Sequence, residues 1–250
     1  TISIKGSNFN NMKTTSIKTS ENTNIISIDN VIIERRTSTE TQPIHSIECS
    51  SQTEFVISKS KIIGSGGIYF NPTTKLAKSI NINNIELEEN KYGIILHPTS
   101  NTNTGLETFR LEQFTIKRVQ RGIDLKSIDY EIIINDGTIE ECNNELFTTL
   151  EGEEANHGIL EVTLCENSIY NTITMSNVKL FNNHYSIYKE TKKYRAAGGI
   201  GLIIKTEDGT NSAISFGVQM TGCKFISNFA QTNNDNDPNQ HSGGGFYFSN

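Results

Sequence analysis

The sequence has little alanine, no tryptophan and only four prolines, and the first of these shortages narrows the choice of fold most. Six alanines in 250 residues leave few copies of the best helix former. By contrast, 35 isoleucines, 29 asparagines, 27 threonines and 23 serines supply β-branched side chains and turn residues. The composition therefore excludes an all-α fold and predicts an all-β chain.

Positive charge and long apolar runs are also in short supply. Lysine and arginine number 22 against 28 aspartates and glutamates, which gives a net charge of −6. An acidic chain has no electrostatic reason to bind a polyanion, and no apolar run approaches the length of a membrane-spanning helix. We therefore expect no nucleic-acid partner and no membrane insertion within this segment.

Cysteine is too sparse to form a disulfide framework in a chain of this length, and no CxxC pair offers a short metal-ligand spacing. Free cysteine is among the most buried residue types, so we expect buried free thiols. The four cysteines are Cys49, Cys142, Cys165 and Cys223.

An internal repeat dominates what is present. Apolar residues recur as an anchor and at the positions five and seven residues before it, and Ser58 is the only exception in these two columns. Apolar residues two apart predict half-buried strands. The eight anchors are Phe9, Ile33, Ile63, Leu87, Ile116, Ile139, Leu180 and Phe225.

A corner is predicted three residues before each anchor, where the two-residue period breaks. Seven of the eight residues there belong to the turn set, which tolerates positive φ or bonds its own backbone. A second corner after the anchor leads to a third strand, at 67–70, 93–96 and 122–125. The first corner column reads Gly6, Asn30, Ser60, Asn84, Gln113, Asp136, Asn177 and Gly222.

These columns predict a single-stranded right-handed parallel β-helix of about eight three-strand coils, forming one domain over residues 1–250. The first anchors follow one another too closely for propeller blades, and no leucine ladder with a helix per repeat is visible. No capping helix is predicted at either end, so we expect a fragment of a longer protein. Long loops that leave the coil at one corner are predicted at 37–54, 97–108, 147–171, 189–197, 206–214 and 230–242, with a further strand at 158–164.

The last two coils carry a second pattern. Phe225-Ile226-Ser227-Asn228 is followed by Gly243-Gly244-Gly245-Phe246, and Leu180-Phe181-Asn182-Asn183 by Gly198-Gly199-Ile200 at the same offset. FxxN followed by a GGA-type tripeptide resembles the repeats of polymorphic outer-membrane (Pmp-type) proteins. That resemblance implies a β-helix displayed outside the cell and used in attachment. In physical terms, Phe fills the interior and Asn caps backbone groups at a bend. Paired Gly lets the chain re-enter the stack of coils after a loop without a side-chain clash.

Candidate catalytic groups were sought among outward carboxylates. Glycosidic hydrolysis needs two carboxylates across a sugar cleft, and stacked coils could supply them from Asp124, Asp129 and Asp136. Asp124 lies between Ile123 and Leu125 and so points outward, whereas Asp136 occupies a corner. We interpret these carboxylates as solvated or corner groups.

No metal, cofactor or catalytic residue is assigned. The five histidines show no HxH or HExxH spacing and are interpreted as loop residues. The segment 235–239 opens like a calcium loop but lacks its Gly and final Glu, and the basic cluster 189–195 is interpreted as a solvated loop. The histidines are His45, His97, His157, His184 and His241.

The leading hypothesis is a non-enzymatic extracellular or cell-surface β-helix that contacts a host or neighbouring-cell receptor or a glycan. The alternatives are a polysaccharide lyase or glycoside hydrolase, a carbohydrate-binding module, and a rigid spacer. Three or more ionisable side chains in one groove, with aromatic sugar platforms beside it, would favour the enzyme. A bare lateral face with variation only in the loops would favour adhesion or spacing. Only Asn71-Pro72-Thr73 approaches an N-glycosylation acceptor, and its proline blocks it, which disfavours a heavily glycosylated coat protein.

Overall fold

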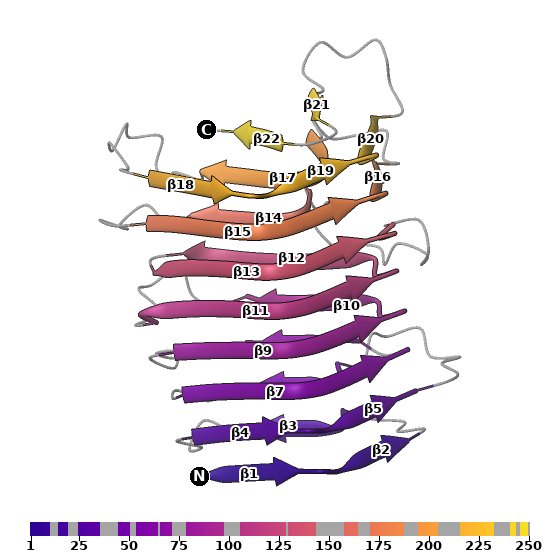
Figure 1. Cartoon of the computed structure of the whole chain (residues 1–250), viewed down its shortest axis with the longest axis vertical. Coiled ribbons are helices and arrows are strands. Elements are labelled where there is room, and N and C mark those ends of the chain that lie inside the picture. Colours follow the sequence, from indigo (N-terminus) through magenta and orange to yellow (C-terminus); the bar gives the residue numbers. More distant parts are fainter. Residues whose placement is uncertain are drawn as a thin grey trace.

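The chain winds into a stack of coils whose strands all pair in parallel (Figure 1). The computed structural model describes residues 1–10, 15–19, 25–35, 45–50, 54–64, 66–71, 79–97, 106–128, 130–143, 158–164, 171–187, 195–204, 216–232, 241–243 and 246–249. In Figure 1 the strands of the near sheet point right, those behind point left, and the chain climbs from the N-terminus, so the coil is right-handed. The predicted right-handed parallel β-helix is confirmed.

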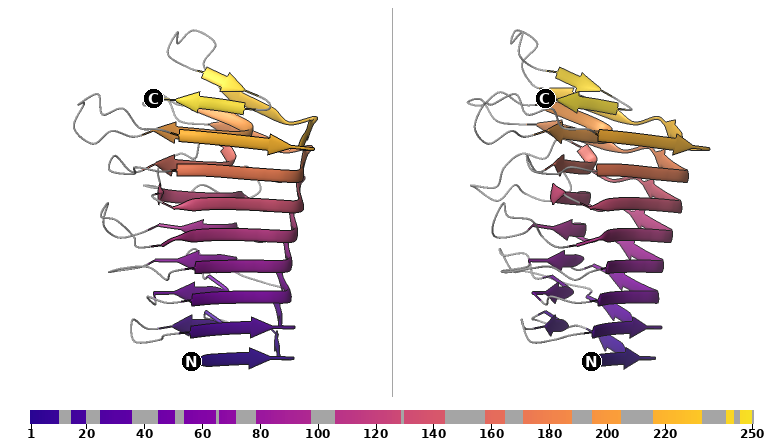
Figure 2. Two further views of the ribbon diagram at one scale, coloured as in Figure 1. Left: turned by 60° about the vertical axis from the view of Figure 1, so that its left-hand side comes forward. Right: turned by 90° about the vertical axis from the view of Figure 1, so that its left-hand side faces the viewer.

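Two large sheets form the walls of the coil, and the side views show them facing each other (Figure 2). The longer sheet, which we call sheet A, follows the order β1 (Ile2–Lys5), β4 (Ile25–Asp29), β7 (Glu54–Ile63), β9 (Ser79–Glu88), β11 (Thr108–Lys117), β13 (Glu131–Glu140), β15 (Asn171–Phe181) and β18 (Phe216–Thr221). Three short strands also belong to it: β2 (Asn8–Asn10), β5 (Ile32–Glu34) and β19 (Lys224–Ile226).

The opposite wall, sheet B, carries the third strand of each coil. Its strands are β3 (Ile17–Thr19), β6 (Ile47–Cys49), β8 (Ile68–Phe70), β10 (Tyr92–Leu96), β12 (Arg121–Ile128), β14 (Gly158–Leu164), β17 (Arg195–Ile204), β21 (His241–Gly243) and β22 (Phe246–Ser249). A third, two-stranded sheet pairs β16 (His184–Ile187) with β20 (Phe229–Thr232).

The apolar columns stack along the axis as predicted. Ile80 pairs with Phe109 and Phe109 with Ile132, and all three side chains are fully buried. The anchors stack in the same way, for example Leu87 on Ile116. Each coil thus adds one layer to a continuous core between the two sheets.

The third coil corrects the sequence alignment by one residue. Ile33 pairs with Ile62, which in turn pairs with Leu87, so the anchor is Ile62 and not Ile63. The apolar position five residues earlier is then Ile57, which removes the apparent exception at Ser58. The slip arose because Ile62 and Ile63 are adjacent and equally apolar.

The first corner turns on a residue in the left-handed region in every coil. Seven of the eight predicted residues have φ between 52° and 65°, and in the third coil the corner residue is Lys59 (φ 48°), not Ser60. Long strands such as β9 and β11 continue through this corner. They pair with each other before and after it, and only the corner residue itself is unpaired. The first two predicted strands of these coils are therefore one bent strand.

The Asn of the FxxN pattern has the predicted capping role. Asn90 donates its side-chain amide to the carbonyl oxygen of the preceding anchor, Ile62, at 3.0 Å. Asn183 and Asn228 repeat this bond with the anchors of their own preceding coils, at 3.0 and 2.9 Å. In these three coils the asparagine hydrogen-bonds its coil to the preceding one.

Some predicted loops contain strands. β6 lies within the predicted loop 37–54, while β20 and β21 overlap the predicted loop 230–242. These strands are three or four residues long, too short for the pattern to separate them from loop. The strand predicted at 158–164 is confirmed as β14. The predicted loop at 206–214 lies outside the described residues.

Candidate functional site

The outer face of sheet A is a regular polar surface that fits the hypothesis of a bare lateral face. Lys61 bridges to Glu86 and Glu88 on the next strand, and Lys117 pairs with Glu140 at 3.2 Å. Exposed ion pairs of this kind contribute little to stability, although they favour the correct register. Among the described residues of this face, Lys179 Nζ lies 4.5 Å from the centre of the Phe181 ring.

The outer face of sheet B differs, because its central column points away from the core and yet is buried on β10, β12 and β14. One residue from each strand forms this column, including Tyr69 of β8, Ile95 of β10, Asp124 of β12 and Glu161 of β14. The exposed fractions of Asp124 and Glu161 are 1% and 3%. Asp124 does point outward, but its interpretation as a solvated carboxylate is wrong.

A buried carboxylate needs compensation, and two neighbours supply it to Asp124. His97, which follows β10, places Nε2 2.7 Å from Asp124 Oδ2, and an Arg121 guanidinium nitrogen lies 3.6 Å from the same oxygen. Burial raises the pKa of the Asp124 carboxyl, but the hydrogen bond and charge of His97, followed by the charges of Arg121 and Lys126, hold this pKa below its ordinary value. Asp124 is therefore an ionised group at neutral pH.

The second oxygen of the same carboxylate, Oδ1, is buried without a hydrogen-bond partner. An unsatisfied buried oxygen of a charged group costs free energy, so the arrangement is poor if its only purpose is stability. Costly polar arrangements of this kind are common at functional sites.

Aromatic rings surround the ion cluster. The rings of His45 and Tyr69 stack with centroids 4.2 Å apart and an interplanar angle of 16°. Tyr92 lies 5.5 Å from His45, and Tyr69 meets the His97 ring edge-on at 6.3 Å. The Arg121 guanidinium lies 5.9 Å from the centre of the Tyr92 ring. We call these residues with Asp124 the sheet B cluster.

A glycine column allows the coils of the cluster to approach closely. A Cβ on Gly67 would lie 2.0 Å from the Tyr92 carbonyl oxygen, and one on Gly93 would lie 2.1 Å from that of Gly122. These glycines are the first residues of the third strands predicted from the sequence. Close stacking sets His97 beside Asp124 although 27 residues separate them along the chain.

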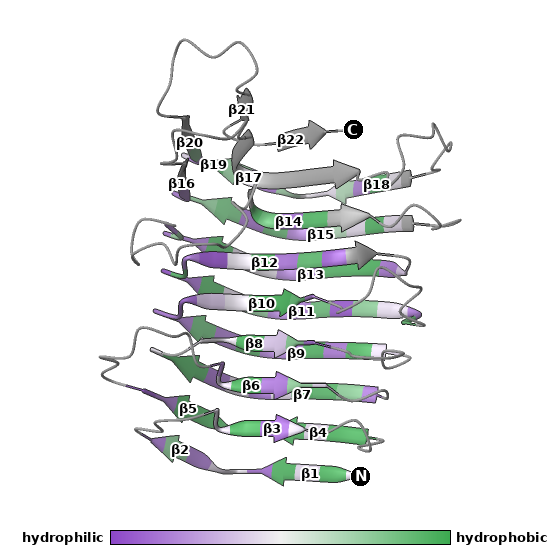
Figure 3. Ribbon diagram, turned by 180° about the vertical axis from the view of Figure 1, so that it is seen from behind, coloured by the Kyte–Doolittle hydropathy of each residue, from purple (hydrophilic) through white to green (hydrophobic). Residues whose placement is uncertain are grey.

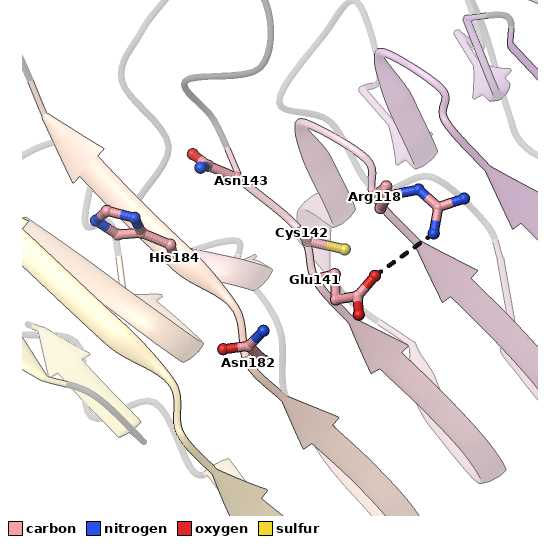
Figure 4. A pocket seen from close by; sticks show the side chains of 6 residues that line it. All are labelled: Arg118, Glu141, Cys142, Asn143, Asn182 and His184. Carbon is pink, nitrogen blue, oxygen red and sulfur yellow. Dashed lines mark hydrogen bonds and ion pairs between the residues drawn. The ribbon is translucent and has the colours of Figure 1, made fainter.

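A separate cleft of about 320 Å³ lies at the second corner (Figure 4). Its lining includes Cys142, whose burial raises the pKa of the thiol to about 12, so this cysteine is a poor nucleophile. Arg118 is already engaged by Glu141, Glu88 and Glu89. The lining residues are Arg118, Glu141, Cys142, Asn143, Asn182 and His184.

Of the remaining candidates, Asp136 lies away from the sheet B cluster. Asp136 turns the first corner and accepts a 2.9 Å hydrogen bond from the Asn177 amide, as expected for a corner carboxylate. Asp129, His157, segment 235–239 and residues 189–194 lie outside the described residues. The side chain of His241 in β21 is likewise not described.

Sequence reasoning missed Tyr69, Tyr92 and Arg121 as site residues. A signal was available, since aligning the glycines that open each third strand places Tyr69, Ile95 and Asp124 in one column. His97 lies just after its strand, so its contact with a carboxylate one coil further on appears only in the structure.

Within the described ranges, no helix is long and apolar enough to cross a membrane. No group of three or more His, Cys, Asp and Glu side chains that could hold a metal ion occurs there either. Comparison of the chain with protein-family models, curated proteins and solved structures gave no match.

Proposed function

We propose that this protein is an extracellular or cell-surface β-helix that binds a glycan through the outer face of sheet B. The observation that carries the proposal is the sheet B cluster, where tyrosine and histidine rings lie beside His97, Arg121 and Asp124. Aromatic faces stack on the apolar faces of sugars, and charged groups bond sugar hydroxyls or carboxylates. Sheet A carries a regular polar surface instead, as a supporting wall does.

The extracellular location is supported by the resemblance of the FxxN and Gly-Gly patterns to Pmp-type repeats. A rigid coil that holds its polar side chains in fixed rows suits attachment, because little conformational entropy is lost on binding. Adhesion and carbohydrate binding share this face, so one binding experiment addresses both.

A glycan array probed with the whole chain tests the proposal. We expect binding to a restricted set of glycans and a loss of about tenfold or more in affinity for Tyr69→Ala, which removes a stacking ring. Thr115→Ala on the outer face of sheet A is the matched control and leaves binding unchanged. Absence of glycan binding, or equal losses for both variants, contradicts the proposal.

The sheet B cluster meets part of the condition set for the enzyme alternative, since three ionisable side chains lie beside aromatic rings. His97 and Arg121 retain 22% and 13% of their side-chain exposure, while Asp124 lies beneath them. A buried acid that orients a partly exposed base is an arrangement used in acid–base catalysis.

A further inference from the structure

We infer that His97, oriented by Asp124, is the proton acceptor in the cleavage of a uronate-containing polysaccharide by β-elimination. The inference rests on the proposed function, because the same face must bind the glycan. It adds a substrate class, the polyuronates, and an activity that binding alone does not require.

The orientation of His97 is the first step of the argument. Nε2 hydrogen-bonds to Asp124 Oδ2 at 2.7 Å. The imidazolium form of His97 carries a proton on both ring nitrogens, and in the neutral form, which acts as the base, this bond keeps the remaining proton on Nε2. Nδ1 is then the basic nitrogen. With 22% of the side chain exposed, the imidazole is within reach of a ligand that lies on the outer face of sheet B.

The burial of the carboxylates decides between hydrolysis and elimination. Hydrolysis requires two carboxyl groups that flank the sugar. Asp124 and Glu161 occupy adjacent coils but are 1% and 3% exposed, so neither can contact the glycosidic bond directly. Elimination needs instead one base and a positive charge that stabilises the substrate carboxylate as negative charge builds up beside it.

Positive groups near Asp124 and the Tyr92 ring supply that charge. Arg121 is the strand partner of Tyr92 on the next coil, and its guanidinium lies over the Tyr92 ring. Lys91 Nζ lies 5.3 Å from the centre of the same ring. Lys126 is close enough to lower the pKa of Asp124. This side of the site therefore favours an anionic sugar over a neutral one.

The reaction balances without a co-reactant. His97 Nδ1 takes the proton from C5 of the uronate, the released electron pair forms the C4=C5 double bond, and the C4–O glycosidic bond breaks. Water protonates the leaving oxygen, and the resulting hydroxide takes the proton from the imidazolium. The products are an unsaturated uronate end and a new free hydroxyl group.

The test incubates the whole chain with polygalacturonate, alginate and a neutral glucan, and measures the ultraviolet absorbance of the unsaturated product together with binding. We expect product from at least one polyuronate and none from the glucan. His97→Gln should lower kcat by about 100-fold or more with KM unchanged, whereas His184→Gln in the separate cleft should have no effect.

Asp124→Asn examines the positioning role, with circular dichroism used to check the fold. Its kcat should also fall while polyuronate binding is retained. Polyuronate binding without any unsaturated product overturns the elimination but leaves the proposed function standing. Absence of both binding and product overturns the inference, while the glycan array decides separately whether the proposed function stands. Turnover that survives His97→Gln overturns the role of His97.

Discussion

At the residue scale, buried polar side chains tie each coil to the next. Asn183 donates to the Ile139 carbonyl oxygen, accepts from the Cys142 amide at 3.0 Å and donates to the Asn228 side-chain oxygen at 2.9 Å. Each bond crosses from one coil to another. These bonds satisfy backbone groups at the second corner that strand pairing leaves over.

Truncating this asparagine should therefore be costly. We expect Asn183→Ala to lower the free energy of unfolding by about 3 kcal/mol, because a buried amide hydrogen and a buried carbonyl oxygen lose their partners. Thr138→Ala on the outer face of sheet A should change it by less than about 0.5 kcal/mol. Urea denaturation of both variants provides the measurement, and equal effects would contradict the role given to Asn183.

The Asp124 carboxylate gives stability a defined pH dependence. Its pKa is lower in the folded protein than in the unfolded chain, so its contribution is fully present above about pH 4 and is lost as pH falls through the folded value. Glu88, whose pKa is also lowered, acts in the same direction. Asp124→Asn should flatten the loss of stability below about pH 4.

Urea denaturation at a series of pH values, with wild type and Asp124→Asn compared, measures this effect. Glu88 remains in the variant, so part of the acid dependence should persist. A variant whose stability falls with pH as steeply as that of wild type would show that folding does not lower the pKa of Asp124.

Cysteine reactivity should follow burial. Cys142 is fully buried, has a pKa raised to about 12 by desolvation, and contacts the Ile116 carbonyl oxygen at 3.9 Å. Cys223 is only partly buried. Peptide mapping after brief alkylation should find Cys223 labelled in the native protein and Cys142 labelled only after unfolding. Early labelling of Cys142 would contradict its place inside the corner.

At the element scale, the first corner depends on residues that accept positive φ. Most coils use Gly, Asn or Asp there, but the third coil uses Lys59 at φ 48°. A lysine in the left-handed region is strained, whereas glycine is not. The adjacent Ser60 is buried and fixes the backbone, since its hydroxyl donates to the Ser58 carbonyl oxygen at 2.8 Å and accepts from the Val31 amide at 3.1 Å.

Two adjacent substitutions test the corrected register of this coil. Lys59→Gly should raise the free energy of unfolding by about 1 kcal/mol, because the strain of the left-handed backbone is relieved. Ser60→Gly should lower it by about 1 kcal/mol or more through loss of the buried hydroxyl. Thermal and urea denaturation would report both changes. The opposite pair of signs would place the corner at Ser60, as the sequence pattern first suggested.

The strands and corners could be predicted because the same inward-facing apolar positions and the same corner position recur in each coil. Apolar columns and the positive-φ column are local patterns, so one sequence carries eight copies of them. The predicted register of the third coil was wrong by one residue because two isoleucines are adjacent there, and the sequence pattern alone does not show which of them fills the interior. Strands as short as β6 escaped detection because three residues show too little alternation.

At the scale of the whole molecule, the candidate site exists only because coils stack. His97 and Asp124 come from neighbouring coils, and the Tyr69 and His45 rings that extend the cluster belong to earlier ones. Figure 3, which views the molecule from the side of sheet B, shows the strands that bring these residues together. The sequence predicted that Asp124 points outward, but its burial and its partner depend on contacts between coils.

The pairing of coils is therefore the claim on which the site and both functional proposals depend. Thr115 of β11 and Thr138 of β13 are direct partners on the outer face of sheet A, with Glu140 two positions further along β13. Directly paired parallel strands bring Cα atoms to a separation that a disulfide can bridge, whereas a shift of two residues exceeds it.

The most direct measurement is disulfide formation in double-cysteine variants, read by mass spectrometry of the linked peptides. Under mild oxidation, Thr115→Cys with Thr138→Cys should form a cross-link in the native protein, and Thr115→Cys with Glu140→Cys should not. Cross-linking of the second pair in preference to the first would contradict the register of the coils and, with it, the position of His97 beside Asp124.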